Sequence, residues 1–267
     1  MALIGVKQMK TIAFVNHKGG VGKTAISMAF AEVLNLRGYK TLIIDLDQQM
    51  NATMTAGVKT DNVVSVYDLL TSFDYKASDG IQSYKHGDII SGDILVADAE
   101  NEMSKLDTPL TMLADALEGL EDKYDYVIID CPPSIGLVTK NAIVAADELI
   151  VVVLPDTPSV DGFGKVAGVA KGIKSNKRLN PTLSIAGVVV NTYDPHGTLD
   201  KQLYKTLPIF AREAGTKVFN TRIRRCVSVR KAQSSHKSLF DFDPDCTSAK
   251  DLKDFVSEYL DMEVSHG

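Results

Sequence analysis

The chain lacks any apolar run long enough to cross a membrane and any cysteine pattern typical of a small fold cross-linked by disulfides. Its longest strongly apolar run, residues 149–154, is far shorter than the roughly 20 residues that a membrane-spanning helix needs. Residues 1–10 have no apolar core of the length found in secretory signals. The three cysteines, Cys131, Cys226 and Cys246, are widely spaced, so they predict neither a disulfide framework nor a metal quartet. A reduced cytosol is the simplest compartment for such a chain.

The composition also lacks the signs of disorder. Hydrophobic residues make up 45% of the chain and charged residues 24%, which is the usual mix of a globular protein. No repeat and no Pro/Gly/Ser-rich linker divides the 267 residues. We therefore expect one domain over residues 10–262, with short tails at residues 1–9 and 263–267.

Acidic residues are scarce in one long segment. Residues 162–240 contain fifteen Lys or Arg but only three acids, a net charge of +12, although the whole chain carries −5. A polyanionic partner is expected to meet this half of the chain. The alternative is an ordinary set of solvated basic helix faces.

Short apolar segments alternate with longer helical patterns along the chain. Strands that are apolar on both faces and separated by helices indicate a parallel sheet with helices on both sides. Right-handed crossovers make this an α/β, doubly wound sheet, in which ligands bind at the carboxyl ends of the strands. The predicted strands are 11–15, 41–44, 94–96, 126–129, 149–154 and 183–190. The predicted helices are 21–36, 109–120 and 248–260, with one more on either side of the last strand.

The strongest motif is the run KGGVGKT at residues 18–24, which follows the first predicted strand and opens the first helix. Glycines let the backbone wrap closely around phosphate, and the helix N-terminus adds a favourable partial charge. Lys23 is expected to reach the β- and γ-phosphates, and the Thr24 hydroxyl to bind Mg²⁺. His17 stands where the strict phosphate-loop pattern has its first glycine. The residues expected to hold the nucleotide here are Gly19, Gly20, Val21, Gly22, Lys23, Thr24 and Ala25.

Carboxylates follow two further predicted strands. Asp45 and Asp47 come at the end of the second strand, and Asp130 comes at the end of the fourth. An acid after a strand is often only a turn residue. Three acids facing a phosphate loop, however, are suited to holding Mg²⁺ through water and to orienting an attacking water.

Together these motifs resemble those of the ParA/MinD group of ATPases. The run at residues 18–24 resembles the deviant Walker A motif of that group, residues 42–53 resemble its second motif, and residues 130–133 (DCPP) match its Walker B motif. The resemblance covers residues 10–260. It implies a P-loop ATPase fold, ATP and Mg²⁺ as cofactors, and an ATP-dependent homodimer.

The resemblance also implies a role for individual residues. Lys18 corresponds to the signature lysine that reaches across the dimer to the phosphates held by the other subunit. Asp47 positions the hydrolytic water, Asp45 supports the Mg²⁺ shell, and Asp130 contacts Mg²⁺ through water. Asn191, at the end of the sixth predicted strand, hydrogen-bonds adenine.

The chain departs from the group's pattern after residue 218. Arg224 stands where the group often has a proline against adenine, and Ser228 stands where it has an arginine associated with DNA binding. The segment is nevertheless rich in basic residues, which bind DNA phosphates without reading the base sequence. The residues expected to contact DNA are Arg222, Arg224, Arg225, Arg230 and Lys231.

Members of the group differ in what the ATP-bound dimer holds. The cysteine spacing disfavours an iron–sulfur member. The last predicted helix, residues 248–260, is acidic on its polar face, which disfavours binding to anionic lipid, and core packing is the better interpretation of its apolar face. We expect a partition ATPase in the cytoplasm that associates with the nucleoid and binds nonspecific double-stranded DNA. The resemblance implies a ParB-like centromere-binding partner that stimulates hydrolysis. A cargo-positioning ATPase and a membrane-associated division-site regulator remain alternatives.

Overall fold

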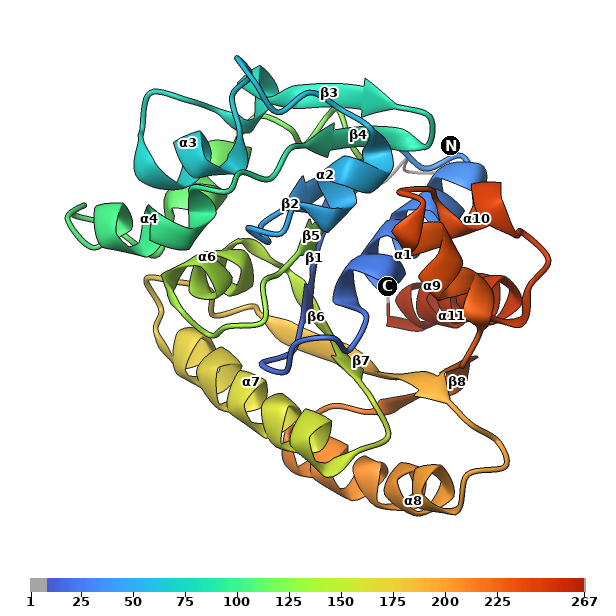
Figure 1. The fold of residues 1–267 in the computed structure, drawn as a ribbon. Coiled ribbons are helices and arrows are strands. Elements are labelled where there is room, and N and C mark those ends of the chain that lie inside the picture. The colour runs from blue at the N-terminus through green and yellow to red at the C-terminus, as the bar shows by residue number, and fades with distance from the viewer. Residues whose placement is uncertain (1–8, 267) are drawn as a thin grey trace, which may run out of the picture.

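An eight-stranded sheet runs through the part of the chain that the computed structural model describes, residues 9–266 (Figure 1). Its strand order is β3-β4-β2-β5-β1-β6-β7-β8, and every pairing is parallel except that of β3 with β4. The mostly parallel, doubly wound architecture that the sequence predicts is therefore confirmed. The strands are β1 (Lys10–Val15), β2 (Thr41–Asp45), β3 (Ile81–Tyr84), β4 (Gly87–Ile90), β5 (Tyr126–Asp130), β6 (Glu148–Val153), β7 (Ser184–Tyr193) and β8 (Val218–Arg224).

Helices cover both faces of the sheet, because its central strands are apolar on both sides. In β1, Ile12 and Phe14 belong to one buried cluster, whereas Ala13 and Val15 belong to the other. The helices that pack on the first face are α1 (Lys23–Leu36), α2 (Asn51–Ala56), α10 (Leu239–Phe242) and α11 (Thr247–His266). Those on the second face are α3 (Val66–Thr71), α4 (Val96–Met103), α5 (Met112–Leu117), α6 (Leu137–Ala145), α7 (Thr157–Ser175) and α8 (Thr198–Glu213). A 3₁₀ turn, η1 (Ala77–Asp79), precedes β3, and α9 (Val227–Ser234) lies beside α10 (Figure 1).

The strand order brings the three sequence motifs to one edge of the sheet. Strands β2, β5 and β1 are neighbours, and Asp45 of β2 is in register with Asp130 of β5. The phosphate-loop motif follows β1 directly. All three motifs therefore stand at adjacent carboxyl ends, where open α/β sheets bind ligands.

The strand predicted at residues 94–96 is wrong. Ile94 and Leu95 are exposed, at 71% and 48%, and Val96 begins α4. A turn at Asp93 precedes this helix, in which its Oδ1 accepts from the N–H of Leu95 at 2.8 Å and its carbonyl accepts from the N–H of Val96 at 3.1 Å. A run of three apolar residues does not distinguish a strand from the start of a helix.

The strand that takes this place in the sheet is β4, whose Ile89 and Ile90 are fully buried. It forms a hairpin with β3, for which no strand was predicted either. Strand β8 was also missed. Its alternation of Arg and Asn with apolar residues is that of a sheet edge, where only one face is covered.

Several boundaries differ from the predicted ones. Helix α1 begins at Lys23 instead of residue 21, and α5 is shorter than the predicted span of 109–120. Helix α11 runs to His266, so residues 263–266 continue it where a tail was expected. Residues 1–8 of the expected N-terminal tail lie outside the described residues.

The apolar face of α11 packs in the core, as predicted. Leu252, Phe255, Val256 and Tyr259 are at most 2% exposed, and Phe255 contacts the rings of Phe30 and Phe219. Over residues 9–266, none of the helices combines the length and the apolar character needed to pass through a bilayer.

Candidate nucleotide-binding site

The loop between β1 and α1 leaves the N-terminus of α1 open to a ligand. Gly22 precedes the helix with φ of 92°, a left-handed conformation that keeps residues 21 and 22 out of the helix. It has no side chain to cap the first turn, and residues 23–26 include no acid. The free N–H groups and the helix dipole therefore favour an anion at this point.

A lysine is buried beside this helix start. Lys23 is 7% exposed, and its Nζ donates to the carbonyl of Asn16 at 3.3 Å. Burial lowers the pKa of Lys23, although Asp130, Cys131 and Asp47 oppose the shift. A phosphate bound at the loop would add negative charge next to this ammonium and favour its charged form.

The Walker B carboxylate is buried with its oxygens unsatisfied. Asp130 is fully buried, and neither Oδ1 nor Oδ2 has a hydrogen-bond partner among the described residues. Burial, together with the neighbouring Asp45, raises the pKa of Asp130 to about 8. Thr24 and Lys23 oppose this shift, so both lie close to the carboxylate. A buried carboxylate beside a threonine hydroxyl fits a hydrated Mg²⁺, since carboxylates, a hydroxyl and waters are the ligands that Mg²⁺ takes.

The two acids after β2 have different surroundings. Both Asp45 oxygens are engaged, because Oδ2 accepts from the Thr53 N–H at 2.9 Å and hydroxyl at 2.8 Å, and Oδ1 accepts from the Asp47 N–H at 3.2 Å. Burial raises the pKa of Asp45 to about 6. Asp47 is 9% exposed, and its Oδ1 accepts from the N–H of Gln49 at 3.0 Å. Asp45 therefore anchors α2, and Asp47 is the acid that remains nearer the surface.

Lys18 pairs with an acid within its own chain. Its Nζ lies 2.5 Å from Oδ2 of Asp156, which comes after β6. The other oxygen, Oδ1, accepts from the N–H of Ser159 at 2.9 Å and caps α7. Partial burial opposes ionisation of Asp156, but the hydrogen bonds from Lys18 and Ser159 outweigh it and lower its pKa.

Asn191 supports the phosphate loop. Its Nδ2 donates to the carbonyl of Val21 at 2.7 Å, and its Oδ1 accepts from the N–H of Thr192 at 2.8 Å. A Cβ on Gly22 would stand 2.2 Å from Nδ2, so this approach requires glycine. Both ends of the amide are thus used within the protein, and its predicted contact with adenine stays a prediction.

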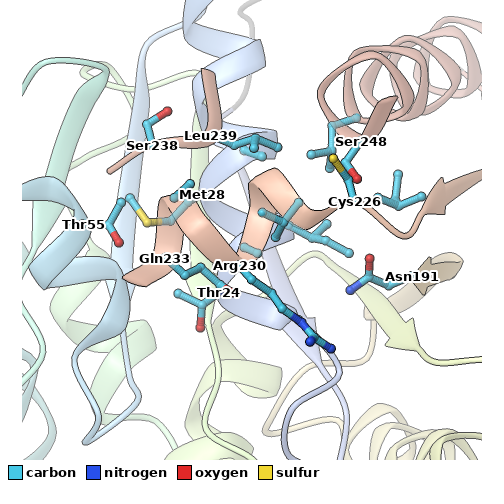
Figure 2. A pocket seen from close by; sticks show the side chains of 18 of the residues that line it. Thr24, Met28, Thr55, Asn191, Cys226, Arg230, Gln233, Ser238, Leu239 and Ser248 are labelled. Atoms are coloured by element: carbon cyan, nitrogen blue, oxygen red, sulfur yellow. The ribbon is translucent and has the colours of Figure 1, made fainter. Parts of the chain in front are cut away.

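A cavity of about 520 Å³ extends from the phosphate loop along α1, a size usual for small-molecule sites. Thr24, Asn191 and the loop after β8 line it, and α9 forms one wall (Figure 2). In this view the Arg230 side chain lies between those of Thr24 and Asn191. Arg224, Arg225 and Arg230, which the sequence assigns to DNA, all line this cavity.

The five basic residues expected at DNA differ in their surroundings. Arg224 forms a bidentate pair with Asp251 of α11, in which Nε donates to Oδ2 at 2.9 Å and Nη2 donates to Oδ1 at 2.6 Å. Arg222 stacks on Tyr193 and Tyr204, with its Cζ 5.1 and 4.2 Å from the ring centroids. The three that are exposed and have no ion-pair partner within residues 9–266 are Arg225, Arg230 and Lys231.

Sequence reasoning missed three residues that shape the site. Asn16 donates to the carbonyl of Val152 at 2.6 Å and accepts from the N–H of Lys18 at 3.0 Å, which orients the start of the loop. Thr53 holds Asp45, and Asp156 holds Lys18. Asn16 and Asp156 follow strands β1 and β6, so the strand-end rule that found the other acids applies to them as well.

The chain is similar to proteins of known family and structure. The AAA domain family matches residues 9–185. The chain is similar to the sporulation initiation inhibitor protein Soj of Bacillus subtilis, with 34% identity over 93% of this chain and 97% of that protein. It is 32% identical to the chromosome-partitioning ATPase Soj of Treponema pallidum, over 94% and 97% of the two chains. Among solved structures, that of cobyrinic acid a,c-diamide synthase from Mycobacterium smegmatis with bound ADP and magnesium has a TM-score of 0.82 and 26% identity, over 97% of each chain.

Proposed function

Because the chain belongs to the Soj and ParA family of partition ATPases, we propose that it is an ATP-dependent DNA partition enzyme that works as a dimer. One observation carries the proposal: a buried lysine at an open helix N-terminus meets a buried carboxylate with no partner among residues 9–266. The lysine is suited to a triphosphate and the carboxylate to a hydrated Mg²⁺. Their meeting at one sheet edge supports hydrolysis of ATP.

Each residue of the site has a role in this reaction. Lys23 and the first N–H groups of α1 bind the phosphate oxygens, and Thr24 and Asp130 hold Mg²⁺, which neutralises charge that develops on the phosphates. Asp47 orients the attacking water. Asp45 accepts hydrogen bonds from Thr53 and from the N–H of Asp47, and it thereby keeps Asp47 in place.

Dimer formation requires Lys18 to change its partner. In the proposed dimer, Lys18 of each subunit contacts the phosphates held by the other. The side chains of Lys18 and Asp156 are 29% and 34% exposed, and such pairs contribute only about 1 kcal/mol or less. A triphosphate carries more charge than one carboxylate, so the exchange is favoured once the second subunit approaches.

The basic segment supports DNA as the partner of the dimer. Arg225, Arg230 and Lys231 are exposed, and lysines and arginines bind DNA phosphates by releasing counterions. Two of them also line the cavity, so nucleotide binding acts on the same wall that carries the basic residues. We propose nonspecific binding to double-stranded DNA, a cytoplasmic and nucleoid-associated location, and a ParB-like partner that stimulates hydrolysis.

The decisive experiment measures DNA retention with ATP, with ADP and without nucleotide. A random-sequence duplex is immobilised and the amount of bound protein is recorded in each state. The proposal expects retention with ATP and Mg²⁺ only, because only the ATP-bound dimer joins two basic surfaces. Equal retention in all three states would contradict it. Flotation with anionic liposomes in ATP is the parallel assay, and retention by liposomes instead of DNA would favour a membrane-associated regulator.

A further inference from the structure

Two cysteines far apart in the sequence meet at one end of the nucleotide cavity. Cys226 lies directly before α9, and Cys246 lies directly before α11. Both are partly exposed, and each thiol is among the neighbours that shift the pKa of the other. The two segments are in contact, because the hydroxyl of Ser248, two residues after Cys246, donates to the carbonyl of Arg224, two residues before Cys226, at 2.7 Å. Cys226 also lines the cavity (Figure 2). The third cysteine, Cys131, is 1% exposed and takes no part in this pair.

Each thiol stands at the start of a helix. The backbone N–H of Ser228, in the first turn of α9, favours the charged form of Cys226, whereas the Ser228 hydroxyl donates to Oδ2 of Asp243 at 2.6 Å. Cys246 accepts from the N–H of Ala249 in α11, with Sγ 3.4 Å from the nitrogen. Two helix N-termini therefore converge on the sulfur pair, and their partial positive charge stabilises a thiolate.

The surroundings favour the charged form on one of the two sulfurs. Partial burial opposes ionisation of Cys226, but the hydrogen bonds from Ser228, Cys246 and Thr247 outweigh it and lower its pKa to about 7. Burial raises the pKa of Cys246, and its hydrogen bond to Cys226 and the nearby Asp243 raise it further. The pair thus consists of an accessible thiolate beside a protonated thiol, the arrangement found in peroxide-sensing cysteines.

We propose that Cys226 is a site of oxidation by hydroperoxides and that Cys246 is its resolving thiol. The Cys226 thiolate attacks one oxygen of the hydroperoxide and the O–O bond breaks, which produces a sulfenic acid. The other oxygen takes up one proton and leaves as water from hydrogen peroxide, or as an alcohol from an organic hydroperoxide. The Cys246 sulfur then displaces the sulfenic hydroxyl, which leaves as water with the proton of the Cys246 thiol, and the S–S bond forms. Two thiols lose two electrons in total, and the peroxide takes up both.

The disulfide changes one wall of the cavity. It closes a loop from residue 226 to residue 246 that contains α9 and α10, and residues 229–239 of this loop include much of the cavity lining. The two sulfurs must approach to about 2.05 Å, and Cys226 then loses the charge that stabilises the start of α9. Since the disulfide displaces this wall, oxidation is expected to weaken ATP binding, a consequence that rests on the proposed nucleotide site.

The chemistry is tested on the full chain by peptide mass mapping after mild treatment with hydrogen peroxide. The expected result is a Cys226–Cys246 disulfide, with a mass loss of about 2 Da, while Cys131 stays reduced. In Cys246→Ser, a sulfenic-acid probe such as dimedone should label Cys226. In Cys226→Ser, Cys246 should stay reduced. Reduced Cys226 and Cys246 in treated wild-type protein, or equal oxidation of Cys131, would overturn the proposal.

The effect on the cavity is tested by titrating a fluorescent ATP analogue before and after peroxide. The affinity of the wild-type chain should fall by about fivefold or more, a loss comparable to one or two hydrogen bonds, and a thiol reductant should restore it. The double variant Cys226→Ser/Cys246→Ser should have the same affinity before and after peroxide, whatever its starting value. If the reduced protein fails to bind the analogue, the nucleotide proposal fails, while the mass map still decides the disulfide. An unchanged affinity in a fully oxidised sample refutes the link to the cavity.

Discussion

Lys18 and Asp156, which are 138 residues apart, form an ion pair in which Lys18 Nζ lies 2.5 Å from Asp156 Oδ2. The lysine that is expected to complete the partner subunit's site is thus held by an acid of its own chain. The acid stands at the end of β6 and also caps α7, so its position does not depend on the lysine. The pair connects residues that follow the carboxyl ends of β1 and β6, which are neighbouring strands.

Replacing Asp156 is expected to favour the ATP-bound dimer. Asp156→Asn removes the charge that holds Lys18, but asparagine still caps a helix. Each of the two subunits breaks one such pair, and a partly exposed ion pair contributes about 1 kcal/mol or less, so the dimer dissociation constant in ATP should fall by up to about thirtyfold. Sedimentation velocity measures it. Asp161→Asn, an exposed acid on the same helix, is the control, and weaker dimerisation of Asp156→Asn would refute a restraining role.

Removal of Lys23 is expected to abolish nucleotide binding. Loss of one partner from a buried charged contact costs about 3–5 kcal/mol, so Lys23→Ala should bind ATP more than about a hundredfold less tightly. Isothermal titration with ATP and Mg²⁺ measures the affinity, and circular dichroism checks the fold. The exposed Lys123→Ala should bind like the wild type. Unchanged affinity in Lys23→Ala would remove the phosphate-loop assignment.

Replacement of Asp47 should separate binding from turnover. Asp47→Ala keeps Lys23 and Asp130, so ATP and DNA should bind nearly as in the wild type. The hydrolysis rate should fall by about 10²–10⁴-fold, the usual contribution of a residue that assists proton transfer or orients water. Phosphate release gives the rate, with the exposed Asp122→Ala as the matched control. Normal hydrolysis in Asp47→Ala would assign the water to another group.

The arginines near α9 should not contribute equally to DNA binding. Arg225→Ala and Arg230→Ala should each lower the slope of log affinity against log salt by about one unit, because each loses one phosphate contact. Arg224→Ala should change the slope less, since Asp251 already neutralises this side chain. The joint replacement of all three should weaken DNA binding strongly.

ATP affinity is measured on the same arginine variants, because all three residues line the cavity. Loss of ATP affinity with an unaltered salt slope would show that these arginines serve the nucleotide and that the DNA face lies elsewhere.

The stability of the chain should depend on pH through Glu32. Burial raises the pKa of Glu32 to about 7, although Ser238 donates to its Oε2 at 2.5 Å and His86 and Lys85 lower the pKa, with Asp241 opposing them. The folded state therefore keeps a proton that the unfolded chain releases at lower pH. The free energy of unfolding should then fall as pH rises from about 4.5 to about 7, by about 3 kcal/mol from this group alone.

Glu32→Gln keeps the hydrogen bond from Ser238 and removes the titration. Chemical unfolding of the nucleotide-free protein at several pH values should show a flatter dependence for this variant than for the wild type. Glu121→Gln, an exposed acid, should behave as the wild type does. An equal slope in Glu32→Gln would mean that another group is responsible.

The sequence alone determined those features of this protein that depend on residues close together in the chain. The phosphate loop is a contiguous motif, and the acids at the ends of β2 and β5 follow long, β-rich apolar runs, so local pattern was enough to predict the parallel sheet and the edge at which its ligand binds. It failed where the signal was weak, as at residues 94–96 and at the edge strands β3 and β8. There, burial in the whole fold decides whether a few apolar residues join a sheet.

The tertiary structure alone decided which side chains meet across long stretches of chain. The contacts of Asn191 with Val21, of Arg224 with Asp251 and of Cys226 with Cys246 join residues on different elements. Composition reveals that the segment 162–240 is basic, but it does not reveal that Asp251 neutralises Arg224 or that Arg225 and Arg230 line the cavity. Such pairings depend on the packing of helices around the sheet, and this follows from the summed burial of many residues instead of from any local motif.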